Sequence, residues 1–115
     1  MTWSKTFGGI GSDRATSVRQ TSDGGYIVVG HIGDYGTISG GGSHDVYLIK
    51  TDASGNMTWS KTFGGTGDDY GFSVQQTSPD GGYIIGSRTN SFGAGWFDVY
   101  LIKTDASGNM TWSKT

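Results

Sequence analysis

Two glycine-rich stretches place carboxylates where they could bind a metal ion. GGTGDDYGF (64–72) and GGIGSDRAT (8–16) both fit the first six positions of the calcium-binding pattern G-G-x-G-x-D, which would make Asp69 and Asp13 the ligands. That pattern works in tandem, whereas these two copies lie 56 residues apart. Calcium also needs about six oxygen ligands. We therefore expect connecting turns without a metal, and a calcium-binding repeat is an alternative.

The other reactive side chains do not form a catalytic pattern. The two histidines, His31 and His44, flank a loop of the first repeat, but Ser87 and Phe97 stand at the corresponding places of the second. A catalytic or metal-binding pair would need partners that this sequence does not repeat. No serine stands in the strand-turn-helix context of a nucleophile elbow. We expect no catalytic residue, no enzymatic activity and no cofactor.

Aromatic side chains offer another chemistry, the stacking of sugar rings. Trp96 has no counterpart in the first repeat, and it belongs with Phe92, Asn90 and Tyr35 to the loops that differ between the copies. Packing of such rings under a glycine-rich loop is the commoner arrangement. A carbohydrate-binding (lectin-like) site at these four residues, with a glycan as ligand, is the alternative.

The segments that would hold these residues come from an internal repeat. The hexapeptide MTWSKT occurs at 1–6, 57–62 and 110–115, and DVYLIKTDASGNMTWSKT (45–62) is reproduced letter for letter at 98–115. Periods of this length are typical of propellers, solenoids or arrays. The repeats divide the chain into a first unit (1–56), a second unit (57–109) and the start of a third (110–115). We expect the chain to be a piece of a longer repeat protein, either excised or engineered.

Each repeat predicts about four strands and no helix. Residues alternate between apolar and polar in MTWSKTF, and apolar runs bounded by turns follow it, which predicts strands at 57–63, 70–77, 83–89 and 97–104. Asp-Gly-Gly predicts a tight hairpin, and Asp-Ala-Ser-Gly-Asn predicts an Asx turn with a left-handed glycine. Pro79 moves the second Asp-Gly-Gly one residue later, so we expect a β-bulge in one copy. The fold class is all-β, with two four-stranded antiparallel units.

Composition excludes several classes of partner. The net charge is −2 with no basic run, which argues against nucleic acid and anionic membrane surfaces as partners. The longest apolar runs, YIVVG and VYLI, have the length of strands and not of membrane helices. The chain has no cysteine, so disulfides and thiolate metal sites are excluded.

The concatenated motifs carry a family resemblance over nearly the whole chain. WSKTFGG, SVxQTS, DGGYI and DVYLIKTDASGN resemble the blade repeats of secreted and cell-surface β-propeller proteins, which are abundant in methanogenic archaea. TDASGNMTW is also similar, more distantly, to the tryptophan-docking segment of quinoprotein propellers. The resemblance implies four-stranded blades, an extracellular or cell-surface parent protein, and a role in binding or scaffolding.

A two-blade chain of this family would need copies of itself. The resemblance makes MTWSKT the outermost strand of a blade, and two blades would leave two apolar faces bare. We expect a homo-oligomeric ring, an eight-bladed tetramer first and a six-bladed trimer as the alternative. Since one MTWSKT is then surplus, we expect Met1–Phe7 to be the copy that pairs, within its chain or with a neighbour. Met110–Thr115 would be displaced or added at an edge.

Repeated aromatic residues are candidates for the interface between blades. Trp3, Trp59 and Trp112 share one repeat position, and Phe7 and Phe63 share another. Large rings at such positions suit a wedge between adjacent blades. If Trp59 is buried there, Trp59→Ala will cost about 3–5 kcal/mol of stability.

Overall fold

The structure, a computed structural model, describes residues 2–8, 13–33, 44–92 and 96–115, which contain eight strands and no helix. Tyr35 lies outside the described residues. The strands of the first repeat are β1 (Asp13–Gln20), β2 (Tyr26–Gly33), β3 (His44–Thr51) and β4 (Met57–Phe63). Those of the second are β5 (Asp69–Gln76), β6 (Tyr83–Thr89), β7 (Asp98–Thr104) and β8 (Met110–Lys114).

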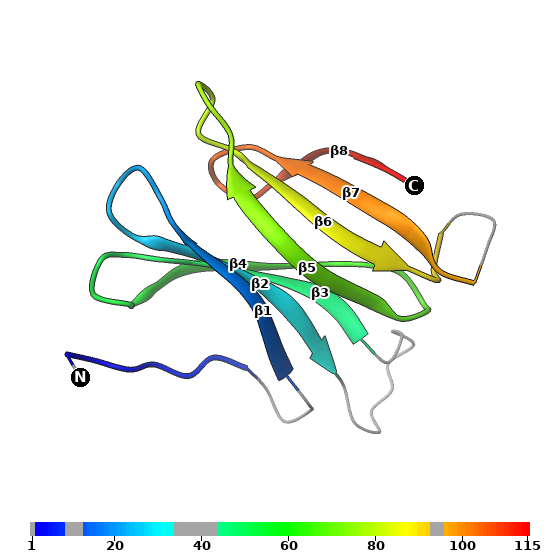
Figure 1. Ribbon diagram of the computed structural model, residues 1–115, viewed down its shortest axis with the longest axis horizontal. Helices are drawn as coiled ribbons and strands as arrows, with labels where there is room; N and C mark the ends of the chain where they lie inside the picture. The colour runs from blue at the N-terminus through cyan, green and yellow to red at the C-terminus, as the bar shows by residue number, and fades with distance from the viewer. Residues whose placement is uncertain (1, 9–12, 34–43, 93–95) are drawn as a thin grey trace.

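The strands form two separate antiparallel sheets of four, each in simple chain order (Figure 1). The first sheet has the order β1-β2-β3-β4 and the second β5-β6-β7-β8. The chain therefore crosses from one sheet to the other only between β4 and β5. The predicted all-β class, with two four-stranded antiparallel units, is confirmed.

The turn that joins the last two strands of each sheet is the same in both copies. The Asp52 carboxylate accepts hydrogen bonds from the backbone N–H of Ser54 and of Asn56, both at 2.9 Å. Gly55 follows with a φ of 83°, which a side chain would disfavour. The copy at Asp105 has the same bonds, so the predicted Asx turn with a left-handed glycine is confirmed.

The hairpin that contains Pro79 absorbs the extra residue of the second repeat. The Thr21 N–H donates to the Gly25 carbonyl at 2.9 Å, and the Thr77 N–H reaches one residue further along, to Gly82, at 2.8 Å. Both sheets carry a bulge at the same place, between Ala15 and Ser17 and between Gly71 and Ser73. The prediction of a bulge in one copy only was wrong, because the longer turn restores the register before β6 begins.

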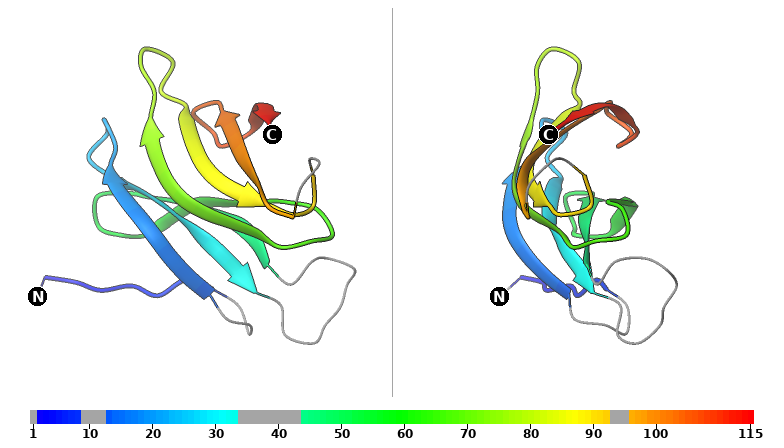
Figure 2. Two further views of the ribbon diagram at one scale, coloured as in Figure 1. Left: turned by 45° about the vertical axis from the view of Figure 1, so that its right-hand side comes forward. Right: turned by 90° about the vertical axis from the view of Figure 1, so that its right-hand side faces the viewer.

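The hydrophobic core lies between the sheets, where β5 packs against β1, β2 and β3. Figure 2 shows β5 running beside the first sheet. The two sheets lie close together at Gly71, where a Cβ would come within 2.6 Å of the Gly30 carbonyl oxygen and 2.8 Å of Val29. A side chain at Gly71 would therefore push the sheets apart. The buried apolar residues of the core are Ile27, Val29, Val46, Leu48, Phe63, Val74, Tyr83, Ile85, Tyr100 and Ile102.

The two ends of the chain behave differently in the single molecule. Residues 110–114 form β8 and pair with β7, whereas residues 2–8 belong to no strand. Met110–Thr115 is thus added at an edge, one of the two arrangements predicted for it, and residues 2–7 do not pair within the chain. Pairing of Met1–Phe7 with a neighbouring chain stays a prediction. The C-terminal hexapeptide follows β7 through a tight turn, and so it reaches the edge of its sheet without a partner chain.

Candidate functional site

Equal register gives every strand residue of the first sheet a counterpart in the second. Tyr26 lies opposite Thr51, as Tyr83 lies opposite Thr104. Counted from there, His31 corresponds to Arg88 and not to Ser87, one residue later than the sequence comparison placed it. Each sheet thus has the same two kinds of face. The face that is buried between the sheets is of one kind in the first sheet and of the other kind in the second.

The inner faces are the two that pack against each other. On the first sheet this face carries Ile27, Val29, Val46 and Leu48, each with 0% of its surface exposed. On the second sheet it carries the alternate side chains, and Val74, Tyr83, Ile85, Tyr100 and Ile102 are all buried there. The contact therefore joins one face of the first sheet to the opposite kind of face of the second sheet. Because the two faces differ, the contact is head-to-tail.

The second outer face is the side of the second sheet that points away from the first. It carries Ile84, Val99 and Leu101, the counterparts of the fully buried Ile27, Val46 and Leu48. Val99 is 73% exposed, and Ile84 and Leu101 are half-buried. Three side chains that belong to the core in the first repeat thus have counterparts that are exposed or half-buried in the second.

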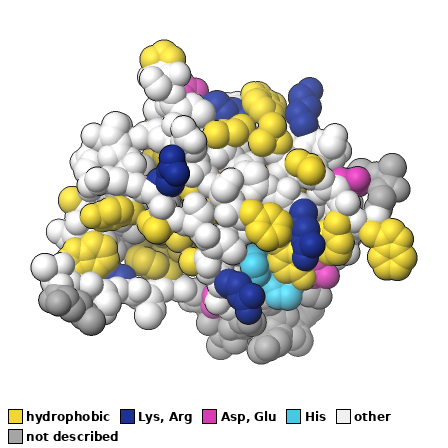
Figure 3. Space-filling view, in the orientation of Figure 1, with side chains coloured by type: hydrophobic (Ala, Val, Ile, Leu, Met, Phe, Trp, Pro, Cys, Tyr) yellow, Lys and Arg dark blue, Asp and Glu magenta, His cyan; other side chains and the backbone are white. Residues whose placement is uncertain are grey.

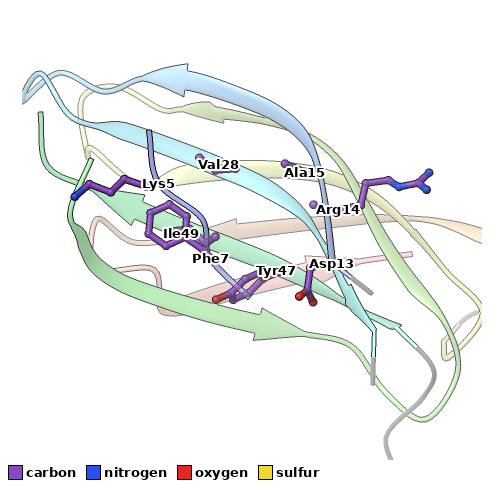
Figure 4. A pocket seen from close by; sticks show the side chains of 9 residues that line it. Lys5, Phe7, Asp13, Arg14, Ala15, Val28, Tyr47 and Ile49 are labelled. Atoms are coloured by element: carbon purple, nitrogen blue, oxygen red, sulfur yellow. The ribbon is translucent and has the colours of Figure 1, made fainter. Parts of the chain in front are cut away.

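The first outer face is the corresponding side of the first sheet. Tyr26, Val28, Tyr47 and Ile49 lie on it and match the buried Tyr83, Ile85, Tyr100 and Ile102. A hollow of about 270 Å³ opens over this face, and Figure 4 shows side chains of the sheet and of the N-terminal segment around it. Its lining is Lys5, Phe7, Asp13, Arg14, Ala15, Val28, Gly30, Tyr47 and Ile49.

The N-terminal segment, residues 2–7, repeats the contacts that β4 makes with the second sheet. The Trp3 ring meets Tyr26 edge to face at 6.0 Å and 61°, and Trp59 meets Tyr83 at 5.9 Å and 62°. A Cβ at Gly55 would lie 2.5 Å from the Trp3 ring. The segment thus lies where an outer strand of a preceding sheet would lie.

The lysine two residues after Trp3 and the lysine two residues after Trp59 also make matching contacts. Lys5 donates to the Asn56 side-chain oxygen at 3.2 Å, as Lys61 donates to Asn109 at 3.1 Å.

The aromatic rings at the repeated positions differ in burial. Trp112 on β8 is the third tryptophan at its repeat position, and it is 42% exposed at the edge of the second sheet. Of the predicted interface rings, Trp59 is half-buried and Phe63 is buried, while Trp3 is 44% exposed.

A second cluster, of histidine and arginine, lies between the sheets near the ends of their strands. The His31 ring lies 5.6 Å from His44 and 4.8 Å from Tyr70, and the Arg88 guanidinium stacks 4.9 Å from the Tyr70 ring. Figure 3 shows the histidines among hydrophobic and basic side chains. His31 Nδ1 is buried with no hydrogen-bond partner among the described residues. Burial lowers the pKa of His31, and the charges of His44, Arg14 and Arg88 lower it further.

The carboxylates singled out for calcium have hydrogen-bonding partners of their own. Asp69 is fully buried and accepts hydrogen bonds from the Thr89 hydroxyl, the Ser91 hydroxyl at 2.9 Å and the Gly65 N–H at 3.1 Å. Asp13 stands at the same place of the first repeat, where a Cβ at Gly8 would meet it. No group of three metal-binding side chains occurs among the described residues. Asp69 therefore fixes the turn between β4 and β5.

Three of the residues proposed to stack a sugar lie in the described part of the chain: Trp96, Phe92 and Asn90. Trp96 is 90% exposed, and Phe92 lies 5.3 Å from the Tyr100 ring. The Asn90 side-chain oxygen accepts from the Asp68 N–H at 2.6 Å. Since Tyr35 lies outside the described residues, a glycan site stays a prediction.

One carboxylate in each hairpin also binds a lysine. Asp23 lies 3.0 Å from Lys50, and Asp80 lies 2.7 Å from Lys103. The hydrogen bond from the Thr21 hydroxyl lowers the pKa of Asp23 most, and that from Lys103 lowers the pKa of Asp80 most. These ionised pairs fix the turns at one end of each sheet.

The outer faces and residues 2–7 thus carry apolar side chains that are exposed or half-buried. The sequence matches no protein-family model and no curated protein. In the described residues, no helix is long and apolar enough to cross a membrane. The tryptophans could be named from the sequence, but their partners Tyr26, Tyr83, Gly55 and Gly108 were missed. The signal for them was the recurrence of Gly-Gly-Tyr and Ser-Gly-Asn after both tryptophans. The tyrosine follows 23 and 24 residues after Trp3 and Trp59, and the glycine of Ser-Gly-Asn follows 52 and 49 residues after them.

Proposed function

We propose that the chain is a non-enzymatic, two-blade β-propeller fragment that completes its ring by head-to-tail association with copies of itself. One observation carries the proposal: the second outer face repeats the side chains that form the core on the first sheet. Ile84, Val99 and Leu101 stand exposed or half-buried, while their counterparts are fully buried. A second copy offers these side chains a matching first outer face.

The contact between copies has the chemistry of the contact inside the chain. Inside the chain, the face with Val46 and Leu48 packs against the face with Ile85 and Ile102. Between copies, the same two kinds of face would meet again. A head-to-tail contact of this kind either closes into a ring or continues as a filament.

Burial of apolar surface supplies the driving force. Fully burying one Val, Leu or Ile side chain stabilises a structure by about 1.5–3 kcal/mol. Ile84, Val99 and Leu101, with Val28 and Tyr47 on the opposing face, would become buried at every junction. Two repeats alone fall below the roughly three units that such architectures need for stability.

The number of copies follows from two blades per chain. Propellers hold about four to eight blades, so the closed rings are a dimer, a trimer or a tetramer. Bulky rings between blades, such as Trp59 on Tyr83, favour wider rings. We propose the tetramer with eight blades, with the six-bladed trimer as the alternative.

We propose an extracellular or cell-surface parent protein whose propeller has a structural or interaction role. The support for this is the resemblance of the motifs to secreted and cell-surface propellers. The near-identity of the two repeats agrees with this, since a specialised site would need residues that differ between them. The proposed partner of this chain is the chain itself, with neither nucleic acid nor membrane.

A charge on the second outer face tests the proposal. Leu101→Asp is expected to shift the protein to the 12.1 kDa monomer in light scattering, with its strand signal in circular dichroism retained. Leu48→Asp, the same change at the fully buried counterpart, is expected to unfold the chain. An assembly of unchanged mass in Leu101→Asp would contradict the proposal.

A further inference from the structure

One junction between two copies would contain two segments of the same sequence. Residues 2–6 and 111–115 both read TWSKT. Trp3 already lies against Tyr26 and Gly55 of its own chain. In a head-to-tail contact, Trp112 of the preceding copy would need the same place, because Trp59 takes it inside the chain. Only one of the two segments can occupy it.

The two segments differ at the residue that follows TWSKT. In the first sheet, β4 continues to Phe63, which lies opposite Val46 and buries it. In the second sheet, the last paired residue of β8 is Lys114, opposite Leu101. Val99, the counterpart of Val46, therefore lies beyond the last pair of β8 and is 73% exposed. In the N-terminal segment, TWSKT is followed by Phe7, the counterpart of Phe63.

The N-terminal segment is also connected as an outer strand should be. It leads into β1 as β4 leads into β5, and the glycine after the phenylalanine lies against the first aspartate of the next strand in both cases. A Cβ at Gly8 would meet Asp13, and one at Gly64 would meet Asp69. Residues 2–7 belong to neither sheet, so their backbone is available for pairing.

We infer that the copies exchange strands: residues 2–7 of one copy pair with β7 of the preceding copy and displace its β8. This inference rests on the proposed self-association and names the contact that closes it. The register follows that of β4 on β3, where Trp59, Lys61 and Phe63 lie opposite Lys50, Leu48 and Val46. Trp3, Lys5 and Phe7 would then lie opposite Lys103, Leu101 and Val99. Each second blade would consist of strands from two chains.

A cysteine pair in the full-length chain tests the register, because the protein has no cysteine of its own. Phe7→Cys with Val99→Cys is expected to form disulfides between chains under mild oxidation. On a non-reducing gel, most of the protein would then run as multiples of 12.1 kDa. The matched control, Val46→Cys with Phe63→Cys, has the same register within one chain and should give only the single-chain band. A single-chain band in the test pair would overturn the inference.

Two matched single substitutions separate strand exchange from self-association. Trp3→Ala is expected to raise the dissociation constant of the assembly roughly tenfold or more, as the loss of a buried aromatic anchor does. Trp112→Ala is expected to leave it within about twofold, because the displaced β8 takes no part in the junction. The reverse order would show that β8 stays and would overturn the exchange, while the proposed function would stand. A wild-type protein that is monomeric would refute the proposed function itself.

Discussion

Val46 and Val99 occupy the same register position on β3 and β7, yet Val46 is fully buried and Val99 is 73% exposed. The sequence around them, DVYLIKTDASGN, is the same. The difference comes from their neighbours, because Phe63 and the second sheet cover Val46. Among the described residues, Val99 has no such cover.

The three tryptophans should differ in what they contribute to the single chain. Trp59 packs on Tyr83 and on Gly108 of the second sheet, while Trp3 and Trp112 are more than 40% exposed. Trp59→Ala should lower the free energy of unfolding by about 2–4 kcal/mol, near the lower end of core aromatic truncations because the ring is only half-buried. Urea unfolding of a dissociated background such as Leu101→Asp would measure this. An equal loss in Trp112→Ala would contradict the prediction.

Glycine is required beneath the Trp59 ring for two reasons. Gly108 has a φ of 83°, and a Cβ there would lie 2.5 Å from the ring. Gly24 has a similar φ of 87° with no atom near its Cβ, which makes it the matched control. Gly24→Ala should cost about 1–2 kcal/mol from the backbone alone, and Gly108→Ala more. Equal melting temperatures for the two variants would show that the tryptophan contact adds nothing.

Acid should weaken the contact between the sheets through His31. Its pKa is lowered from the ordinary 6.5 by burial first and then by the charges of His44, Arg14 and Arg88. Below that value the unfolded chain binds more protons than the folded chain, so stability should fall as the pH falls from about 6.5. Urea unfolding at pH 7.5 and 5.5 should show this loss. His31→Gln should reduce it, and an unchanged loss in this variant would refute the assignment.

Calcium should not stabilise the fold. The Asp69 carboxylate receives three hydrogen bonds from Thr89, Ser91 and Gly65, so its oxygens already have donors. The melting temperature should be the same in chelator and in millimolar calcium. A melting temperature that rises steeply with calcium, as ligand linkage requires, would restore Asp13 and Asp69 as ligands.

Much of the fold could be predicted because local chemistry dictates it. The Asp-Ala-Ser-Gly-Asn turn needs only its own aspartate and glycine, and alternation in MTWSKTF marks a strand without reference to the rest of the chain. The exact repeat also predicted two units of four strands. These features depend on residues close in sequence.

The rest depends on contacts over long distances in the chain. The position of the Pro79 insertion could not be read from the sequence, because a longer turn and a second bulge fit the same letters. Nor could the partner of Trp59 be named, since Tyr83 and Gly108 lie 24 and 49 residues away. In the proposed strand exchange, the copy of MTWSKT that pairs with β7 depends on the presence of a second chain, which the sequence does not state.

The mass of the intact assembly tests self-association most directly. Light scattering at micromolar concentration should give a whole-number multiple of the 12.1 kDa chain, four chains first and three as the alternative. Each corresponds to an even number of blades. A stable 12.1 kDa monomer at that concentration would contradict the proposal, because the outer faces with Val99 and Leu101 would then need no partner.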